Sequence, residues 1–389
     1  MDILMHAPWP YEYATELASA LADSGCGDHV CLQTRANYPY AQALTARLSQ
    51  PYPDPAAAGN RASRGLAHAT GVARVVRQLQ CERPDVFHIQ ALHRPALDWP
   101  LIVAARAAGA AVVWTAHNAL PHENRRYDAV LFRRIYRHVD AVIAHTEQTA
   151  ARLVNELGAP AARVHRIAHG GFARTAAPAP TRGAARAALE LAGDVFVLLF
   201  FGRIRPYKGL DVLVAALDRL AGHRVIAIVA GHDQFGEAAK LAGRIDVRLD
   251  LRRVDAETTA QYFAAADLVV LPYRAIDQSG VLMLALTYGS AVAATDVGGL
   301  GEIIEHGHTG FLLPAPDSQA LANLIIELRR DPARLAHVRQ NVSRALASQL
   351  GWTHLAAETR AVYRTLREPQ TTSETLPESG RATGHDRPS

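Results

Sequence analysis

The sequence predicts an α/β protein with two domains, each built on a parallel sheet, and three observations support this fold class. Short runs of branched and aromatic apolar residues recur along the chain, as expected for parallel strands that are buried on both faces. Most of these runs are followed by apolar residues at helical spacing. The pattern stops in a stretch rich in Pro and Gly at residues 172–193 and then restarts. The chain has 389 residues, which is enough for two domains of ordinary size.

The composition is that of a globular protein, and it argues against several classes of partner. Charged residues make up 20% of the chain and apolar residues 49%. The formal net charge of +4 is too small to predict binding to nucleic acid, and the chain has no long basic run. Three cysteines, Cys26, Cys31 and Cys81, indicate a reducing compartment rather than a disulfide framework.

The start of the chain and its longest apolar stretch predict a cytoplasmic protein. The opening residues, MDILMHAPWP, lack the basic start and long apolar region of a signal peptide. Residues 100–116 are the best candidate for a membrane span, but Arg106 interrupts them. We therefore expect neither a secreted protein nor one that spans a membrane.

The first half begins with a strand at residues 2–7, followed by a rigid aromatic loop, Pro8-Trp9-Pro10-Tyr11. Trp9 and Tyr11 either shape a pocket for a substrate or simply pack this loop. The other elements predicted in this half are helices at residues 13–21, 61–80 and 147–157 and strands at residues 85–89, 111–115, 141–145 and 164–168.

Histidines follow two of these strands. His88 and His93 lie at and just beyond the end of one strand, and His117 and His122 lie beyond the end of the next. Because the carboxyl ends of parallel strands meet at one edge of a sheet, these side chains should gather beside a crevice. Histidines so gathered could in principle hold a metal. Their H-x4-H spacing does not align two ligands as H-E-x-x-H does, however, so we predict no metal site.

Residues 123–139 are predicted to form an amphipathic basic helix. A solvated face is the default explanation for its arginines, and contact with anionic lipid is the alternative when a substrate is lipid-linked. Peripheral membrane contact therefore stays open. The arginines are Arg125, Arg126, Arg133, Arg134 and Arg137.

The second half opens on the most informative stretch, VFVLLFFGRIRPYKG at residues 195–209. Its apolar start predicts a buried strand, and an apolar helical pattern begins at Leu210. Arg203 and Lys208 are thus expected at an exposed junction of strand and helix, where ligands bind and a helix start favours an anion. Lys occurs only at positions 208 and 240, whereas Arg supplies the other strong cations. We interpret Arg203 and Lys208 as a grip for a phosphate or diphosphate.

A second phosphate-binding turn is predicted at Gln278-Ser279-Gly280-Val281, which leads into a helix at residues 282–288. Glycine and Ser at a helix start leave backbone N–H groups free for a phosphate or sugar oxygen. Residues 369–389 are rich in Pro, Ser, Thr, Gly and charge and should be disordered. The remaining elements predicted are strands at residues 225–230, 268–271 and 292–294 and a last helix at residues 351–367.

The stretch that begins at residue 195 and the region around residues 278–281 resemble parts of a known family. GRIRPYKGLDVLVAAL resembles the phosphate-gripping segment of family 4 retaining glycosyltransferases, and residues 266–313 resemble the donor-sugar region of that family in order and spacing. The resemblance implies the GT-B fold, in which two Rossmann-like domains face a central cleft and a C-terminal helix crosses back to the first domain. The implied parts are an acceptor-side domain at 1–172, a linker at 173–193, a nucleotide-sugar domain at 194–350, a returning helix at 351–368 and a tail at 369–389.

The resemblance also implies a retaining, metal-independent transfer of a sugar, without a cofactor, from a nucleotide-diphosphate sugar to a hydroxyl group. The acceptor would be a glycan, a lipid-linked sugar or a small-molecule natural product. The residues with a catalytic role would be His117, Arg203 and Lys208. The donor would contact Gly202, Arg203, Lys208, Gln278, Ser279, Gly280, Val281, Gly299 and Glu302. The acceptor would contact Trp9, Tyr11, His88, His93 and His122.

One departure from the family pattern concerns the nucleotide. Most relatives carry two glutamates eight positions apart, one for the donor sugar and one for the ribose of the nucleotide. The corresponding positions here hold Leu284 and a residue near Ile276, and neither is acidic. The chain resembles a subset with a Gln-Ser-Gly turn in place of the pair. Which residue binds the ribose is therefore open.

Other functional classes stay open on the sequence. A sugar-nucleotide epimerase of related fold would convert a donor without an acceptor, and a non-catalytic partner of another glycosyltransferase would explain the missing glutamates. A phosphorylase that uses pyridoxal phosphate would need Lys208 or Lys240 for its Schiff base. A nicotinamide oxidoreductase is disfavoured, because Gly298-Gly299-x-Gly301 is not the G-x-G-x-x-G fingerprint. The sequence does not indicate an oligomeric state.

Overall fold

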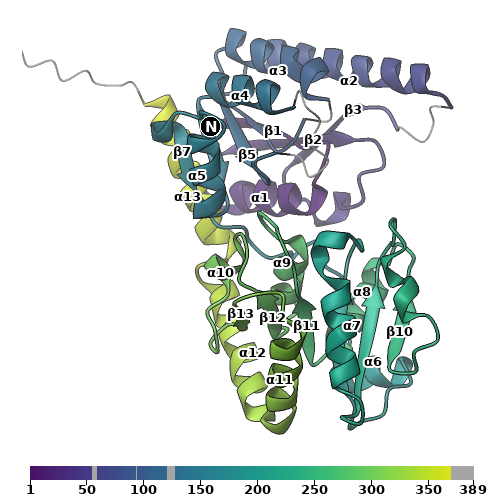
Figure 1. Cartoon of the computed structure of the whole chain (residues 1–389). Helices are drawn as coiled ribbons and strands as arrows, with labels where there is room; N and C mark the ends of the chain where they lie inside the picture. The colour runs from purple at the N-terminus through teal and green to yellow at the C-terminus, as the bar shows by residue number, and fades with distance from the viewer. Residues whose placement is uncertain (55–58, 93, 121–127, 369–389) are drawn as a thin grey trace, which may run out of the picture.

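The structure of the chain is a computed structural model that describes residues 1–54, 59–92, 94–120 and 128–368. Within this part, two parallel sheets with helices on both faces form two domains, and the first lies above the second in Figure 1. The predicted disordered tail, residues 369–389, lies outside the described residues.

The first domain alternates strands and helices. Its strands are β1 (Asp2–His6), β2 (His29–Arg35), β3 (Arg47–Tyr52), β4 (Val86–Ile89), β5 (Ala111–Ala116), β6 (Ala141–Ala144) and β7 (Val164–Arg166). Its helices are α1 (Tyr11–Asp23), α2 (Arg61–Glu82), α3 (Pro95–Ala107), α4 (Asp128–His138) and α5 (Glu147–Asn155), with short 3₁₀ helices η1 (Ala41–Ala43) and η3 (Ala161–Arg163).

The second domain repeats this alternation. Its strands are β8 (Phe196–Phe201), β9 (Val225–Ala230), β10 (Val247–Asp250), β11 (Leu268–Leu271), β12 (Val292–Thr295) and β13 (Phe311–Leu313). Its helices are α6 (Arg182–Ala188), α7 (Leu210–Arg219), α8 (Ala256–Ala265), α9 (Gly280–Thr287), α10 (Leu300–Ile303), α11 (Ser318–Arg330) and α12 (Pro332–Ala347), with 3₁₀ helices η4 (Pro206–Lys208) and η5 (Glu237–Leu241).

The order of the strands is that of a doubly wound fold. It runs β3-β2-β1-β4-β5-β6-β7 in the first sheet and β10-β9-β8-β11-β12-β13 in the second. β8 lies between β9 and β11 and is apolar along its whole length, FVLLFF, because neighbouring strands and helices cover it on all sides. The predicted fold class, two α/β domains with parallel sheets, is confirmed.

The stretch that was predicted as a linker, residues 173–193, contains α6, and this helix packs on α8 of the second domain. Arg186 of α6 pairs with Asp267 at 2.5 Å, and both side chains are buried. Asp267 also accepts the backbone N–H of Val197 at 2.8 Å. Because buried charges need such partners, this pair fixes α6 to the second domain. The segment that joins the two domains is therefore shorter than predicted.

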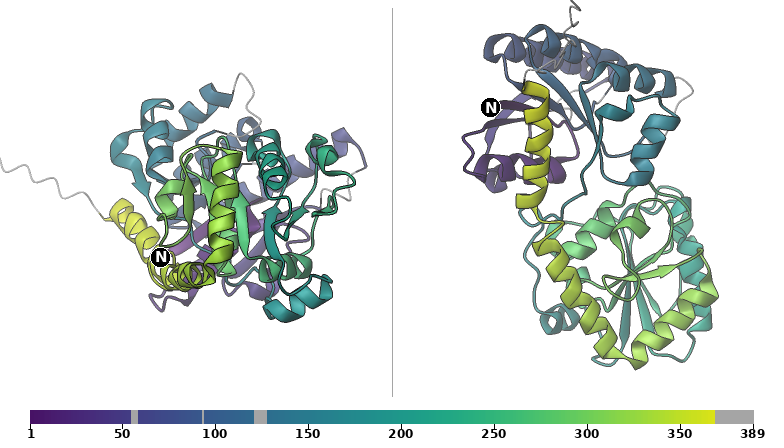
Figure 2. Two further views of the ribbon diagram at one scale, coloured as in Figure 1. Left: turned by 60° about the horizontal axis from the view of Figure 1, so that its bottom comes forward. Right: turned by 90° about the vertical axis from the view of Figure 1, so that its left-hand side faces the viewer.

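The last helix, α13 (Trp352–Arg367), leaves the second domain and lies along the first, as Figure 2 shows. It packs against α1, and its Arg360 forms a buried ion pair with Asp28 at 2.5 Å. Trp352 Nε1 donates to the carbonyl O of Gly171 at 2.6 Å, close to where the domains meet. The helix thus crosses back as predicted. None of the helices in the described ranges is long and apolar enough to cross a membrane.

Candidate active site

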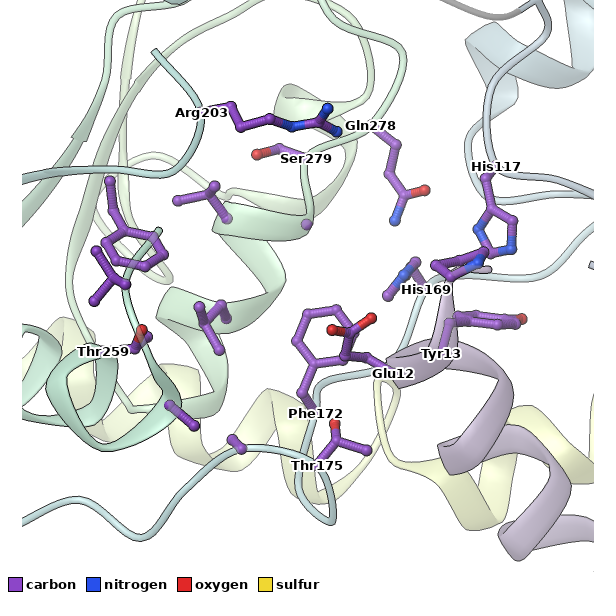
Figure 3. A pocket seen from close by; sticks show the side chains of 18 of the residues that line it. Glu12, Tyr13, His117, His169, Phe172, Thr175, Arg203, Thr259, Gln278 and Ser279 are labelled. Carbon is purple, nitrogen blue, oxygen red and sulfur yellow. The ribbon is translucent and has the colours of Figure 1, made fainter. Parts of the chain in front are cut away.

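A cavity of about 740 Å³ lies between the two domains. Figure 3 shows side chains from the first domain, the second domain and the segment between them around this space. The cavity is at the carboxyl edges of the sheets, where ligands bind in open α/β folds. The predicted site residues that line it are Trp9, His117, Arg203, Lys208, Gln278, Ser279, Gly280 and Val281.

Lys208 is buried beneath the end of β8, with only 6% of its surface exposed, and is not at the exposed junction that we predicted. Its Nζ donates to the carbonyl O of Phe201 at 3.4 Å and lies 5.4 Å from the centre of the Tyr273 ring. The backbone turns at Gly202, whose φ of +93° favours glycine. A Cβ at this position would meet Lys208 Nζ and Val281 Cγ2 at 3.0 Å. Gly202 therefore makes room for both side chains.

Two other cations, Arg203 and Arg205, lie near the ammonium group of Lys208. Burial, together with the positive charges of Arg203 and Arg205, lowers the pKa of Lys208 to about 7. Within the described residues, no carboxylate forms an ion pair with Lys208 or Arg203. An anion bound beside these cations would restore the full charge on Lys208.

The start of α9 lies next to this ammonium group. Ser279 caps the helix, and its Oγ accepts the backbone N–H of Leu282 at 3.2 Å. The N–H groups of Gly280 and Val281 belong to the first turn of α9 and have no intrahelical acceptor, which suits them to bind an anion. Lys208 Nζ and Val281 Cγ2 both lie 3.0 Å from the point that a Cβ of Gly202 would occupy, so the two predicted phosphate-binding segments adjoin each other.

His117 follows β5 and lines the same cavity, on the wall opposite Arg203 in Figure 3. Its Nε2 donates to Gln90 Oε1 at 3.1 Å, which leaves Nδ1 as a hydrogen-bond acceptor. Tyr13 packs edge-on against the ring, with ring centres 4.8 Å apart. Burial, together with neighbouring histidines, keeps the pKa of His117 well below its ordinary value. The imidazole is therefore neutral near pH 7.

Two further histidines, His145 and His169, were not predicted and pack beside His117. Their ring centres lie 5.1 and 6.3 Å from that of His117. Nδ1 of His145 donates to the carbonyl O of Ile167 at 2.9 Å, and Nδ1 of His169 donates to Gly170 O at 2.6 Å. Each follows a strand, as His117 does, so the same positional signal was present in the sequence. Among the described residues, no group of three His, Cys, Asp or Glu is placed to hold a metal ion.

Two residues predicted to contact an acceptor do not line the cavity. His88 is fully buried, and its ring nitrogens bond to the hydroxyls of Tyr363 at 2.6 Å and Thr115 at 2.7 Å. This correction follows from α13, which covers the face of the sheet where His88 lies. Tyr11 packs edge-on against Tyr38, with ring centres 5.6 Å apart. Both residues therefore support the first domain from within.

The other residues predicted on the acceptor side lie in different places. Trp9 lines the cavity and is 47% exposed. His93 and His122 lie outside the described residues. In the basic helix, Arg133 donates to the carbonyl O of Glu156 at 3.1 Å, and Arg134 lies over the ring of Trp99 at 4.7 Å. These two arginines thus also serve contacts within the first domain.

Gly299 and Glu302, which were predicted to bind the donor, join the two domains instead. The Glu302 carboxylate accepts the backbone N–H groups of Glu147 at 2.6 Å and Gln148 at 3.0 Å, at the start of α5. A Cβ at Gly299 would meet Thr146 Cγ2 at 2.2 Å, so glycine is needed for the domains to approach. Neither residue lines the cavity. The N-terminus of a helix attracts a carboxylate, and the N-terminus of α5 binds that of Glu302 in this way.

Asp277 makes a second link, directly beside the cavity. Its Oδ2 accepts the backbone N–H of Ala119 at 3.1 Å, and its Oδ1 pairs with Arg152 of α5. Ala119 lies two residues beyond His117, and Asp277 directly precedes Gln278. The link therefore holds the loop of His117 against the turn that starts α9.

Comparison with known proteins places this geometry in a family. Residues 12–170 match the family model described as Glycosyltransferase Family 4, and residues 195–331 match the model for glycosyl transferases group 1. A D-inositol 3-phosphate glycosyltransferase of Thermobispora bispora is 30% identical over 320 residues, which cover 76% of this chain and 73% of that protein. The chain belongs to glycosyltransferase family 4.

Other relatives match over a shorter stretch. A D-inositol 3-phosphate glycosyltransferase of Catenulispora acidiphila is 34% identical over 239 residues, or 58% of this chain and 56% of that protein. The chain thus spans only about half the length of this relative.

Solved structures agree with the GT-B fold expected of the family. Anabaena HepE in complex with UDP-glucose has a TM-score of 0.72 and 22% identity, over 94% of this chain and 99% of that one. Sucrose-phosphate synthase from Thermosynechococcus elongatus has a TM-score of 0.74 and 21% identity, also over 94% and 99%.

Proposed function

We propose that this chain is a retaining glycosyltransferase that moves a sugar from a nucleotide-diphosphate sugar to a hydroxyl group of a glycan, a lipid-linked sugar or a small-molecule natural product. The observation that carries this proposal is the buried ammonium group of Lys208, which lies beside the start of α9 with no carboxylate partner in the described part of the chain. Family membership and the UDP-glucose bound in the HepE structure support a nucleotide sugar as the donor.

The proposed chemistry breaks the bond between the anomeric carbon and the phosphate oxygen and forms a bond from that carbon to the acceptor oxygen. Negative charge grows on the leaving diphosphate, and fixed donors that face it lower the barrier. Lys208, Arg203 and the N–H groups at the start of α9 would supply this stabilisation without a metal ion. In the retaining route, the leaving phosphate takes the proton of the acceptor hydroxyl on the same face of the sugar.

His117 would act on the donor sugar from the other wall. Its neutral ring keeps Nδ1 as an acceptor, since Nε2 is held by Gln90. Nδ1 can therefore accept a hydrogen bond from a sugar hydroxyl. We place the chain in the subset in which a Gln-Ser-Gly turn replaces the paired glutamates. A cytoplasmic location, with membrane contact through the basic residues of the segment 123–139 for a lipid-linked acceptor, is part of the same proposal.

A panel of nucleoside diphosphates tests the proposal. We expect one of UDP, GDP, ADP and dTDP, at about 100 times its dissociation constant, to stabilise the protein by about 2.7 kcal/mol in a thermal-shift assay. The shift, and sugar transfer from the matching donor, should persist in EDTA. Loss of transfer in EDTA that manganese or magnesium restores would contradict metal independence. Conversion of the donor to its epimer without an acceptor would point to an epimerase instead.

Affinity for that nucleoside diphosphate should fall as the pH rises above 7. In the free protein the pKa of Lys208 is lowered to about 7, and only the protonated amine attracts the diphosphate. Binding therefore raises this pKa, so the complex takes up a proton at pH 8, and affinity falls by at most about tenfold per pH unit. Calorimetry in two buffers with different heats of ionisation measures the uptake. A constant affinity from pH 7 to 9 would show that Lys208 does not face the diphosphate.

A further inference from the structure

The nucleotide wall of the cavity lacks the acidic residues that the family pattern leads one to expect. Leu284 and Ile276 line the cavity where the glutamates would be sought. A ribose carries two hydroxyl groups whose protons need acceptors when they leave water. The proposed nucleotide donor therefore requires an acceptor from another part of the cavity.

Polar side chains on the second-domain wall of the cavity already bond to other groups of the protein. Asp255 caps α8 by accepting the N–H of Thr258 at 2.8 Å and pairs with Arg252 at 3.2 Å. Thr259 Oγ1 donates to Asp255 O at 2.7 Å. Tyr288 donates its hydroxyl proton to a carbonyl O of the segment between the domains at 3.0 Å. These contacts stabilise α8, α9 and that segment.

Glu12, in the first turn of α1, contributes a carboxylate of the first domain to the cavity. In Figure 3 it lies beside Phe172, with its carboxylate toward the cavity. Glu12 Oε1 accepts the hydroxyl proton of Tyr40 at 2.9 Å, and within the described residues no donor bonds to Oε2. Burial and Glu12 itself raise the pKa of Tyr40, so the phenol stays a donor that orients the carboxylate.

The second domain forms the cavity wall that faces Glu12 and Tyr40. Arg253 lines the cavity on the loop between β10 and α8, and its charge acts on the Tyr40 phenol. The pair of Tyr40 and Glu12 thus faces the loop beside α8 across the cavity. A nucleotide whose phosphates sit at Lys208 would extend between these two walls.

We propose that Glu12 binds the ribose hydroxyls of the nucleotide, from the first domain, and so takes the role of the glutamate that is absent at position 284. This inference rests on the proposed function. It implies that the nucleotide bridges the domains, with its phosphates held by the second domain and its ribose by the first. A carboxylate discriminates for hydroxyl groups because its charge is left without compensation when they are missing.

Binding of a matched pair of nucleotides tests the role of Glu12. The probes are the nucleoside diphosphate that stabilises the protein most in the panel and its 2′,3′-dideoxy form, each titrated into the full chain by calorimetry. We expect the wild type to bind the hydroxyl-bearing form about 10 to 100 times more tightly. Glu12→Ala should reduce this ratio to below about threefold, because it weakens binding of the hydroxyl-bearing form and removes the uncompensated charge that disfavours the dideoxy form. Glu12→Gln, which keeps the size of the side chain, should give an intermediate ratio.

The control is Glu257→Ala, which removes an exposed acid of α8 that does not line the cavity. It should keep the wild-type ratio, and all variants should remain folded without ligand at the temperature of the titration. A wild type that does not discriminate, or a ratio that survives in Glu12→Ala, overturns the proposal for Glu12. If no nucleoside diphosphate binds at all, the proposed function itself fails.

Discussion

Replacing Lys208 with Met should lower kcat for sugar transfer by about 10²–10³-fold while the protein stays folded. The ammonium group lies beside the start of α9, where the diphosphate is expected to leave, and loss of one donor of this kind costs about 2.7–4 kcal/mol in the transition state. Methionine keeps the buried stem of the side chain. Since burial opposes the charge on Lys208, the free energy of unfolding should stay the same or rise.

The chain offers a matched control for this substitution. Lys240, the other lysine, lies on η5 and is exposed, and it does not line the cavity. Lys240→Met should leave kcat unchanged in the same assay. Equal losses in the two variants, or full activity in Lys208→Met, would remove the phosphate grip from the proposed mechanism.

Replacing His117 with Ala should slow both sugar transfer and the hydrolysis of the donor by water, by about 10- to 100-fold. The residue lines the cavity opposite Arg203, and its free Nδ1 is positioned to accept a hydrogen bond from the donor sugar. Hydrolysis without an acceptor isolates this donor-side role. Both rates should be measured at saturating donor. The same substitution of His93 or His122 should have a smaller effect.

His88 supplies the contrast, because it is buried outside the cavity. His88→Ala leaves the hydroxyls of Tyr363 and Thr115 without their partner, so it should lower the free energy of unfolding by about 2–4 kcal/mol. At a temperature where the variant is folded, donor hydrolysis should be near normal. If His117→Ala hydrolyses donor at the normal rate but no longer transfers sugar, His117 belongs to the acceptor site instead.

The sequence patterns did not predict the strands β2, β3, β10 and β13, and the reasons are physical. β3, β10 and β13 are edge strands, and β3 and β10 mix polar with apolar residues, as in RLSQPY and VRLD. An edge strand is less enclosed than a central one, so its apolar pattern is weaker. β2 is interior but carries the buried polar residues Gln33 and Thr34. The central strands, which are covered on both faces, were predicted because burial leaves them almost wholly apolar.

The fold class and the edge of the sheets at which the cleft lies follow from the sequence alone, and so does the placement at that edge of the two segments that we predict to bind an anion. The apolar run at residues 195–201 requires a strand buried on both faces, and cations directly between that strand and a helix must lie at the carboxyl edge of the sheet. The turn at residues 278–281 starts a helix for reasons equally local. Such features follow from chain proximity and from the periods of strands and helices.

Which side chains those segments meet depends on how distant elements pack. Glu302 binds the start of α5, and His88 bonds to a tyrosine of α13, although 155 and 275 residues separate these partners in the chain. Lys208 is buried beside Gly202, where a Cβ would crowd its Nζ, and Glu12 reaches the cavity because the domains face each other. A sequence pattern reports how a residue sits on its own helix or strand. Contacts between distant elements, and the desolvation that shifts a pKa, arise only when the elements pack.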